Sequence, residues 1–319
     1  MTQEKSESNN TKKLEQVVDN RGPEHRLFGE LLKELLMPLN VQVDSSYPIS
    51  KGPPELDVII SRKFDQWTPE QLSFMPTGIK ENLCKYNILE LKYSQSVNED
   101  GISQLLGYRS GFKRLNKLKA TDDICAFLIT SKSPSKETLL NVGFESTGLK
   151  GVYCSNYPVI NKIVIISIND LAEIQQNMLL KLFASKKSVF VQAVKYYIAK
   201  KFSLFNDSVV RVIIKIISFR LRKQTGGDLM QAIQKNFTRE EQEAVVNMFN
   251  MFAEAFDDPR FRFIGIKPKD VTDYFDPKDI VANIPPKYRL AGLAPQERLA
   301  GLSSKDLKQL KQLLSKYDL

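Results

Sequence analysis

The sequence is poor in residue types on which several common chemistries depend. It contains one histidine, His25, which excludes sites built on paired or clustered histidines, including the two-histidine zinc motif of metalloproteases. Its three cysteines, Cys84, Cys125 and Cys154, show neither CxxC spacing nor the pattern of a disulfide framework. We therefore expect three buried thiols in a reducing compartment, and any catalysis must use carboxylates, lysine, serine, tyrosine or cysteine.

Long apolar runs are also missing. No stretch approaches the roughly 20 apolar residues that a membrane-spanning helix requires, and the N-terminal MTQEKSESNNTKK is too polar for a secretory signal. We expect a cytoplasmic protein with no membrane partner. Apolar residues nevertheless make up 42% of the 319 residues, which is enough for a substantial packed core.

Positive charge exceeds negative charge. Lysine and arginine number 46 against 37 aspartate and glutamate residues, which gives a formal net charge of +9. This excess favours a polyanionic partner such as nucleic acid through counterion release, but charge alone does not identify the partner.

Composition and apolar periodicity divide the chain into four expected parts. A disordered leader over residues 1–22 is followed by an α/β domain over 23–170, an α-helical region over 171–285 and a C-terminal tail over 286–319. The patterns of the α/β domain predict, in order, a helix over 25–39, strands over 53–61 and 85–94, a helix over 99–119, and strands over 124–130 and 162–168. Beyond the last strand they predict helices over 170–184, 188–202, 208–223 and 240–256.

The tail contains a near-repeat. RLAGLAPQE over 289–297 is followed directly by RLAGLSSKD over 298–306, which leads into an expected helix over 303–317. Two copies are too few for a solenoid, so we interpret the segment as a turn-helix tail or a docking site for a partner protein.

Three charged residues lie in strands that are otherwise apolar. Asp57 lies in ELDVII and Glu90 in ILELK, and Lys92 projects from the same face of its strand as Glu90. Such charges are conspicuous because burying a charge is costly. Phosphodiester hydrolysis needs a divalent cation held by oxygen ligands, which carboxylates on strand ends can supply. We expect the three side chains to converge on one point.

The pattern Asp57-x(32)-Glu90-x-Lys92 resembles the active site of the PD-(D/E)xK nuclease superfamily. The resemblance implies an α/β, restriction-endonuclease-like fold with a mixed β-sheet core flanked by helices. It also implies that Asp57 and Glu90 bind Mg²⁺ or Mn²⁺, while Lys92 orients the attacking water and stabilises charge at the phosphate. The motif has a proline before its aspartate, whereas this chain has Glu55-Leu56 there. That proline is often absent in members of the superfamily.

Further segments extend the resemblance. Gln104 and Tyr108 form a QxxxY pair similar to the helix motif that follows the lysine strand in several branches, and they share one helix face. A carboxylate from the first helix often completes such sites, and Glu30 is the better candidate for this metal ligand, with Glu34 one turn further on. Over about residues 24–185 the chain is similar to the recombination-promoting nuclease and putative transposase group. The segments that carry this resemblance are ILELKYSQSVNEDGISQLLGY and SNYPVINKIVIISIND.

Other candidate residues have plainer interpretations. Arg109, Lys113 and Lys117 recur every four residues and are candidates for phosphate contacts, although solvated basic helix faces are common. Gln104 and Tyr108 also fit a polar edge and a core aromatic of an amphipathic helix.

Two residues are given no functional role. His25 is interpreted as a surface residue. Trp67 is interpreted as a hydrophobic anchor for the segment between the first two strands. We expect this segment to form a short helix or a substrate loop.

Three hypotheses about function follow. The first is a DNA endonuclease using magnesium or manganese, whose helical region assists binding or assembly and for which a homodimer would suit double-strand cleavage. The second is a catalytically inactive nuclease fold that binds nucleic acid or protein. The third is a helical scaffold that docks a partner through residues 289–319. The sequence leaves DNA versus RNA and the cleavage specificity open.

Overall fold

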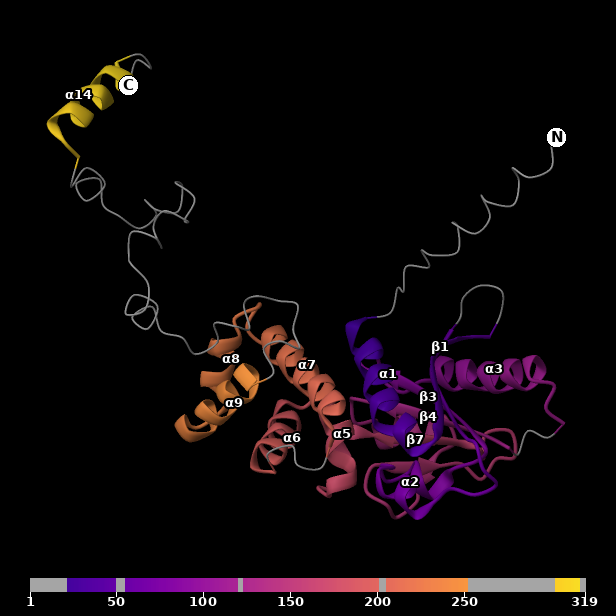
Figure 1. Cartoon of the computed structure of the whole chain (residues 1–319). Coiled ribbons are helices and arrows are strands. Elements are labelled where there is room, and N and C mark those ends of the chain that lie inside the picture. Colours follow the sequence, from indigo (N-terminus) through magenta and orange to yellow (C-terminus); the bar gives the residue numbers. More distant parts are fainter. Residues whose placement is uncertain (1–21, 50–54, 120–122, 201–204, 252–301, 316–319) are drawn as a thin grey trace, which may run out of the picture. The chain divides into compact units, whose positions relative to one another are not determined.

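The computed structural model describes residues 22–49, 55–119, 123–200, 205–251 and 302–315. The chain separates into two compact units, Met1–Ile264 and Gly265–Leu319. The first unit is mixed α/β, with helices flanking a sheet and further helices after it, which confirms the expected fold class at this level (Figure 1). Most of the expected leader and the 289–301 part of the near-repeat lie outside the described residues.

Seven strands of the described residues form one sheet. In chain order they are β1 (Val41–Pro48), β2 (Glu55–Arg62), β3 (Tyr86–Lys92), β4 (Ile124–Thr130), β5 (Glu145–Ser146), β6 (Val152–Cys154) and β7 (Ile163–Ser167). Their spatial order is β1-β2-β3-β4-β7-β6-β5, with β3, β4 and β7 parallel and the outer neighbours antiparallel. Parallel strands are covered on both faces, which explains why ICAFLIT and KIVIISI are continuous apolar runs.

Two hydrophobic cores cover the two faces of the sheet. α1 (Pro23–Leu36) packs on one face with Val58 and Ile60 of β2, while α3 (Glu99–Leu115) and α4 (Lys136–Asn141) cover the other. Ile59 faces the α3 core, as strand alternation requires, but Leu56 faces that core too. The alternation of β2 therefore breaks between Leu56 and Val58, at the position of Asp57.

The helices that follow the sheet pack against the same core as α1. They are α5 (Met178–Lys181), α6 (Lys187–Ala199), α7 (Asp207–Lys223), α8 (Leu229–Asn236) and α9 (Arg239–Met251). α7 lies beside α1 (Figure 1), where Lys215 Nζ is 2.7 Å from Glu30 Oε1 and Lys223 Nζ is 2.6 Å from Glu24 Oε1. The helices expected from residue 171 thus lie in one compact unit with the sheet and reach the helix that borders the candidate site.

A buried arginine ties α7 to the segment after β7. Arg220 is 6% exposed, and its guanidinium donates to the carbonyl oxygens of Leu182 and Ala184 at 2.8 and 2.6 Å. The guanidinium also lies over the rings of Tyr93 and Phe190. Because Tyr93 directly follows β3, this contact links α7 to the strand of Glu90 and Lys92.

The periodicity predicts most elements, and the differences have local reasons. β1 is not predicted because its second half, Ser45-Ser46-Tyr47-Pro48, is polar and ends in proline. β5 and β6 are too short to show alternation. The expected helix over 170–184 was wrong in extent, since only α5 and short 3₁₀ turns form there. The segment between β2 and β3 holds the short helix α2 (Pro69–Ser73).

The cysteines differ from the expectation. Cys84 lies just before β3 and Cys125 lies in the neighbouring β4, and the two form a disulfide with a Cα–Cα distance of 5.6 Å. The expectation of three thiols was therefore wrong for this pair. The two cysteines are 41 residues apart in the sequence, and only the pairing of β3 with β4 brings them together. Cys154 is a half-buried thiol, and burial raises its pKa.

In the second unit the described residues form one helix, α14 (Ser304–Leu314), as the sequence predicts. Ser303 caps it, since its side-chain oxygen accepts from the backbone N–H of Asp306. Among the described residues of the whole chain, no helix is both long and apolar enough to cross a membrane.

Candidate active site

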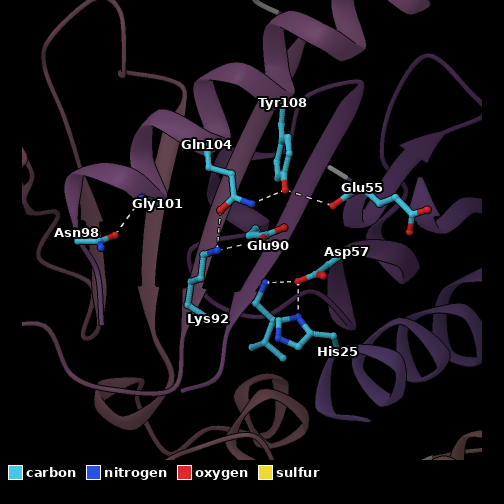
Figure 2. Close-up of polar contacts among 10 residues, drawn as sticks. His25, Glu55, Asp57, Glu90, Lys92, Asn98, Gly101, Gln104 and Tyr108 are labelled. Atoms are coloured by element: carbon cyan, nitrogen blue, oxygen red, sulfur yellow. Dashed lines mark hydrogen bonds and ion pairs between the residues drawn. The ribbon is translucent and has the colours of Figure 1, made fainter. Parts of the chain in front are cut away.

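Asp57 lies where the β2–β3 ladder ends. The last paired residues are Val58 and Leu89, and one step further along this register Asp57 faces Glu90. Asp57 is 4% exposed, and its Oδ2 accepts the backbone N–H of Leu91 at 2.8 Å (Figure 2). The side chain thus takes the place of a backbone acceptor, which fixes the carboxylate against the strand that carries Glu90 and Lys92.

Glu90 is the carboxylate that its surroundings perturb most. It is 5% exposed, and its Oε2 is buried without a hydrogen-bond partner among the described residues. Burial is the largest cause that raises its pKa to about 7, and the negative charge of Asp57 adds to it; Lys92 and His25 act in the opposite direction. The attraction of Lys92 and His25 thus does not offset the cost of burying Glu90 beside Asp57.

Lys92 is held by a chain of side chains from α3. Its Nζ donates to Glu90 Oε1 at 3.1 Å and to Gln104 Oε1 at 2.7 Å. Gln104 Nε2 in turn donates to Tyr108 Oη, and that hydroxyl donates to the carbonyl oxygen of Glu55 at 3.3 Å (Figure 2). The QxxxY pair and the lysine strand thus form one hydrogen-bonded array that fixes the position of the ammonium group.

The start of α3 is fixed by its cap. The Asn98 side chain accepts the backbone N–H of Gly101 at 3.0 Å, so the helix begins at Glu99. An added Cβ at Gly101 would lie 4.0 Å from Lys92 Cε, which shows how closely this first turn approaches the lysine. The register of the cap therefore places Gln104 over β3.

No family model, curated protein or solved structure matches the chain. The interpretation of the site therefore depends on its geometry and chemistry.

His25 is the site residue that the sequence interpretation missed. Its Nδ1 lies 2.9 Å from Asp57 Oδ2, and its side chain is 23% exposed (Figure 2). One signal was available, because His25 precedes the buried Phe28, Leu32 and Leu35 at spacings of three, four and three residues. That spacing places the imidazole on the sheet-facing side of α1. The expectation of a surface residue was wrong.

Glu30, the expected third metal ligand, lies elsewhere on α1. Its carboxylate binds Lys215 at 2.7 Å, and the side chain lines a cavity that Asp57 also lines. The structure therefore places Glu30 beside the site, while His25 is the α1 residue in contact with Asp57.

The basic residues expected along α3 fall into different environments. Arg109 is buried at 8% exposure, and Lys113 is partly exposed near the end of the helix. Lys117 is exposed but lies beyond Leu115, where the helix ends, in a left-handed conformation with φ of 50°. The three residues thus do not form a single basic face.

The donor set suits a hard divalent cation. Asp57 and Glu90 offer carboxylate oxygens side by side, and the partnerless Glu90 Oε2 is a buried atom that a cation would satisfy. No group of three or more His, Cys, Asp or Glu side chains in the described ranges is gathered to hold a metal by itself. Mg²⁺ commonly takes one or two carboxylates and completes its shell with water and substrate phosphate.

Proposed function

We propose that the chain is a metal-dependent nuclease of the PD-(D/E)xK type, with a restriction-endonuclease-like fold. The observation that carries this proposal is the buried arrangement of Asp57, Glu90 and Lys92. Two carboxylates lie side by side, one has an oxygen without a partner, and an ammonium group is held beside it by Gln104. A purely structural ion pair would not need a second buried carboxylate next to the first.

Asp57 and Glu90 would hold Mg²⁺ or Mn²⁺. When bound, the cation polarises the scissile phosphate and makes water a stronger nucleophile at neutral pH. Its positive charge would also offset the repulsion between the two carboxylates, which now adds to the raised pKa of Glu90. The contact of His25 with Asp57 orients that carboxylate from the α1 side.

Lys92 would supply a positive charge at the phosphate. Its ammonium has three donors, of which Glu90 and Gln104 accept two. The third donor can bind a phosphate oxygen or the attacking water. Gln104 and Tyr108 act as positioning residues, because they hold the ammonium in one place and so reduce the reorganisation needed during reaction.

Nucleic acid is the proposed substrate, and DNA is the first to test. Full-length protein should be incubated with supercoiled and linear DNA in Mg²⁺, in Mn²⁺ and in EDTA. Cleavage is expected in the metal buffers alone, and Asp57→Ala or Glu90→Ala should abolish it while circular dichroism shows a folded protein. Binding of DNA without cleavage in any buffer would instead favour a non-catalytic binding module. RNA in parallel reactions identifies the preferred nucleic acid.

A further inference from the structure

A cavity of about 270 Å³ lies between α1 and β1, and Asp57 forms part of its wall. We call it the α1–β1 pocket. It is lined by His25, Arg26, Glu30 and Lys33 from α1, Ser45 and Ser46 from β1, and Asp57 from β2. The pocket therefore borders the proposed metal site through Asp57 and is also lined by β1, the outermost described strand on that side of the sheet.

The pocket holds two cationic side chains, Arg26 and Lys33, beside the two carboxylates of Glu30 and Asp57. Its two carboxylates both have partners, since Glu30 binds Lys215 and Asp57 is in contact with His25. Arg26 and Lys33 make no ion pair within the described part of the chain, and Arg26 is exposed. Arg26 and Lys33, which form no ion pair with the described residues, thus line a cavity next to the proposed site of phosphodiester hydrolysis.

The backbone on the β1 side of the pocket has an unusual conformation. Ser46 has a left-handed conformation with φ of 57°, and its neighbours Ser45 and Tyr47 pair with Val58 and Leu56, so Ser46 stands opposite Asp57. Such strain in a non-glycine residue often marks a functional position. Gly29 lets α1 approach closely here, because an added Cβ would lie 3.0 Å from Ser45 Cβ.

We propose that the α1–β1 pocket binds a backbone phosphate of the nucleic acid next to the scissile phosphate, with Arg26 and Lys33 as its contacts. The assignment of the neighbouring phosphate as scissile rests on the proposed function. The planar Arg26 guanidinium can bind two phosphate oxygens, Lys33 acts as a point charge, and the serine hydroxyls are further donors.

The lining favours a phosphate over a base or a small organic ligand. None of the described residues around the pocket is Phe, Tyr or Trp, the side chains on which unpaired bases usually stack. The volume is just below the range of about 300–1,000 Å³ typical of small-molecule sites.

The test measures DNA binding by the full chain in EDTA, where no cleavage is expected, as a function of salt. The double variant R26A/K33A should lower the slope of log K against log salt by about 0.9, since each neutralised duplex phosphate contributes about 0.9. The matched control K136A/K235A removes two exposed lysines on α4 and α8 and should keep the wild-type slope. The variant R26K/K33R keeps both charges and should restore most of the slope.

Each outcome decides the proposal. A lower slope for R26A/K33A alone, with an unchanged unfolding midpoint, supports the pocket, and it does so even if the wild type cleaves nothing and the proposed function fails. Equal slopes for R26A/K33A and K136A/K235A overturn the pocket even if the wild type is an active nuclease. Absence of DNA and RNA binding by the wild type overturns both proposals.

Discussion

Replacing Glu90 with glutamine should stabilise the metal-free protein at alkaline pH. The raised pKa means that the folded state binds the Glu90 proton more tightly than the unfolded state, in which the group has its ordinary value. Folding stability due to this group is therefore lost as pH rises between about 4.5 and 7, because the folded state must then bury a carboxylate. Glutamine keeps the shape and removes the charge.

The magnitude follows from the two pKa values. The interval from 4.5 to about 7, at about 1.4 kcal/mol per pH unit, corresponds to about 3 kcal/mol once the pH exceeds both values. Glu90→Gln should thus raise the free energy of unfolding by up to about 3 kcal/mol at pH 8, and by about 1 kcal/mol or less near pH 5.

Urea unfolding in EDTA at pH 5 and pH 8 measures the effect. Glu243→Gln is the control, because it neutralises an exposed carboxylate on α9. The control should change the free energy of unfolding by less than about 0.5 kcal/mol at both pH values. An effect of Glu90→Gln that is independent of pH, or a loss of stability at pH 8, would refute the reasoning that the cost of burying the Glu90 carboxylate exceeds its attraction to Lys92.

The remaining predictions test other parts of the site and fold. Mg²⁺ at about ten times its Kd should stabilise the wild type by about 1.4 kcal/mol, but not Glu90→Gln; equal shifts in thermal unfolding would contradict a metal site there. Gln104→Ala should lower single-turnover cleavage about tenfold with unchanged DNA affinity, because Lys92 loses its anchor; a change in affinity alone would argue against positioning. His25→Ala should raise the Mg²⁺ concentration needed for half-maximal cleavage, with His25→Asn less affected. Arg220→Met should cost about 2–4 kcal/mol in urea unfolding by leaving two buried carbonyls without donors, and a loss below 1 kcal/mol would contradict this.

The parts of the fold that the sequence predicts are those with strong local patterns. Ile124–Thr130 is apolar throughout, and α1 repeats its leucines at helical spacing, so both are predictable without tertiary information. β1 depends instead on pairing with β2, because Ser45 and Ser46 carry no strand signal of their own. The pairing of Cys84 with Cys125 likewise depends on the parallel register of β3 and β4.

In the candidate site, too, the residues that could be predicted are those set by local sequence patterns. Lys92 and Gln104 could be chosen from the sequence because strand alternation and i,i+4 helix spacing are local rules, and the structure joins them at 2.7 Å. Contacts between distant elements have no such rule. Glu30 meets Lys215 across 185 positions, and His25 meets Asp57 across 32, so the α1 side of the site could be described only from the folded chain.

The most direct test of the account is single-turnover cleavage of supercoiled DNA in Mg²⁺ by the wild type, Lys92→Ala and the control Lys136→Ala, an exposed lysine on α4. The account predicts cleavage by the wild type and the control, and a loss of at least about 100-fold in rate for Lys92→Ala, with all three proteins equally folded. Equal cleavage by Lys92→Ala and the wild type would contradict the proposed active site.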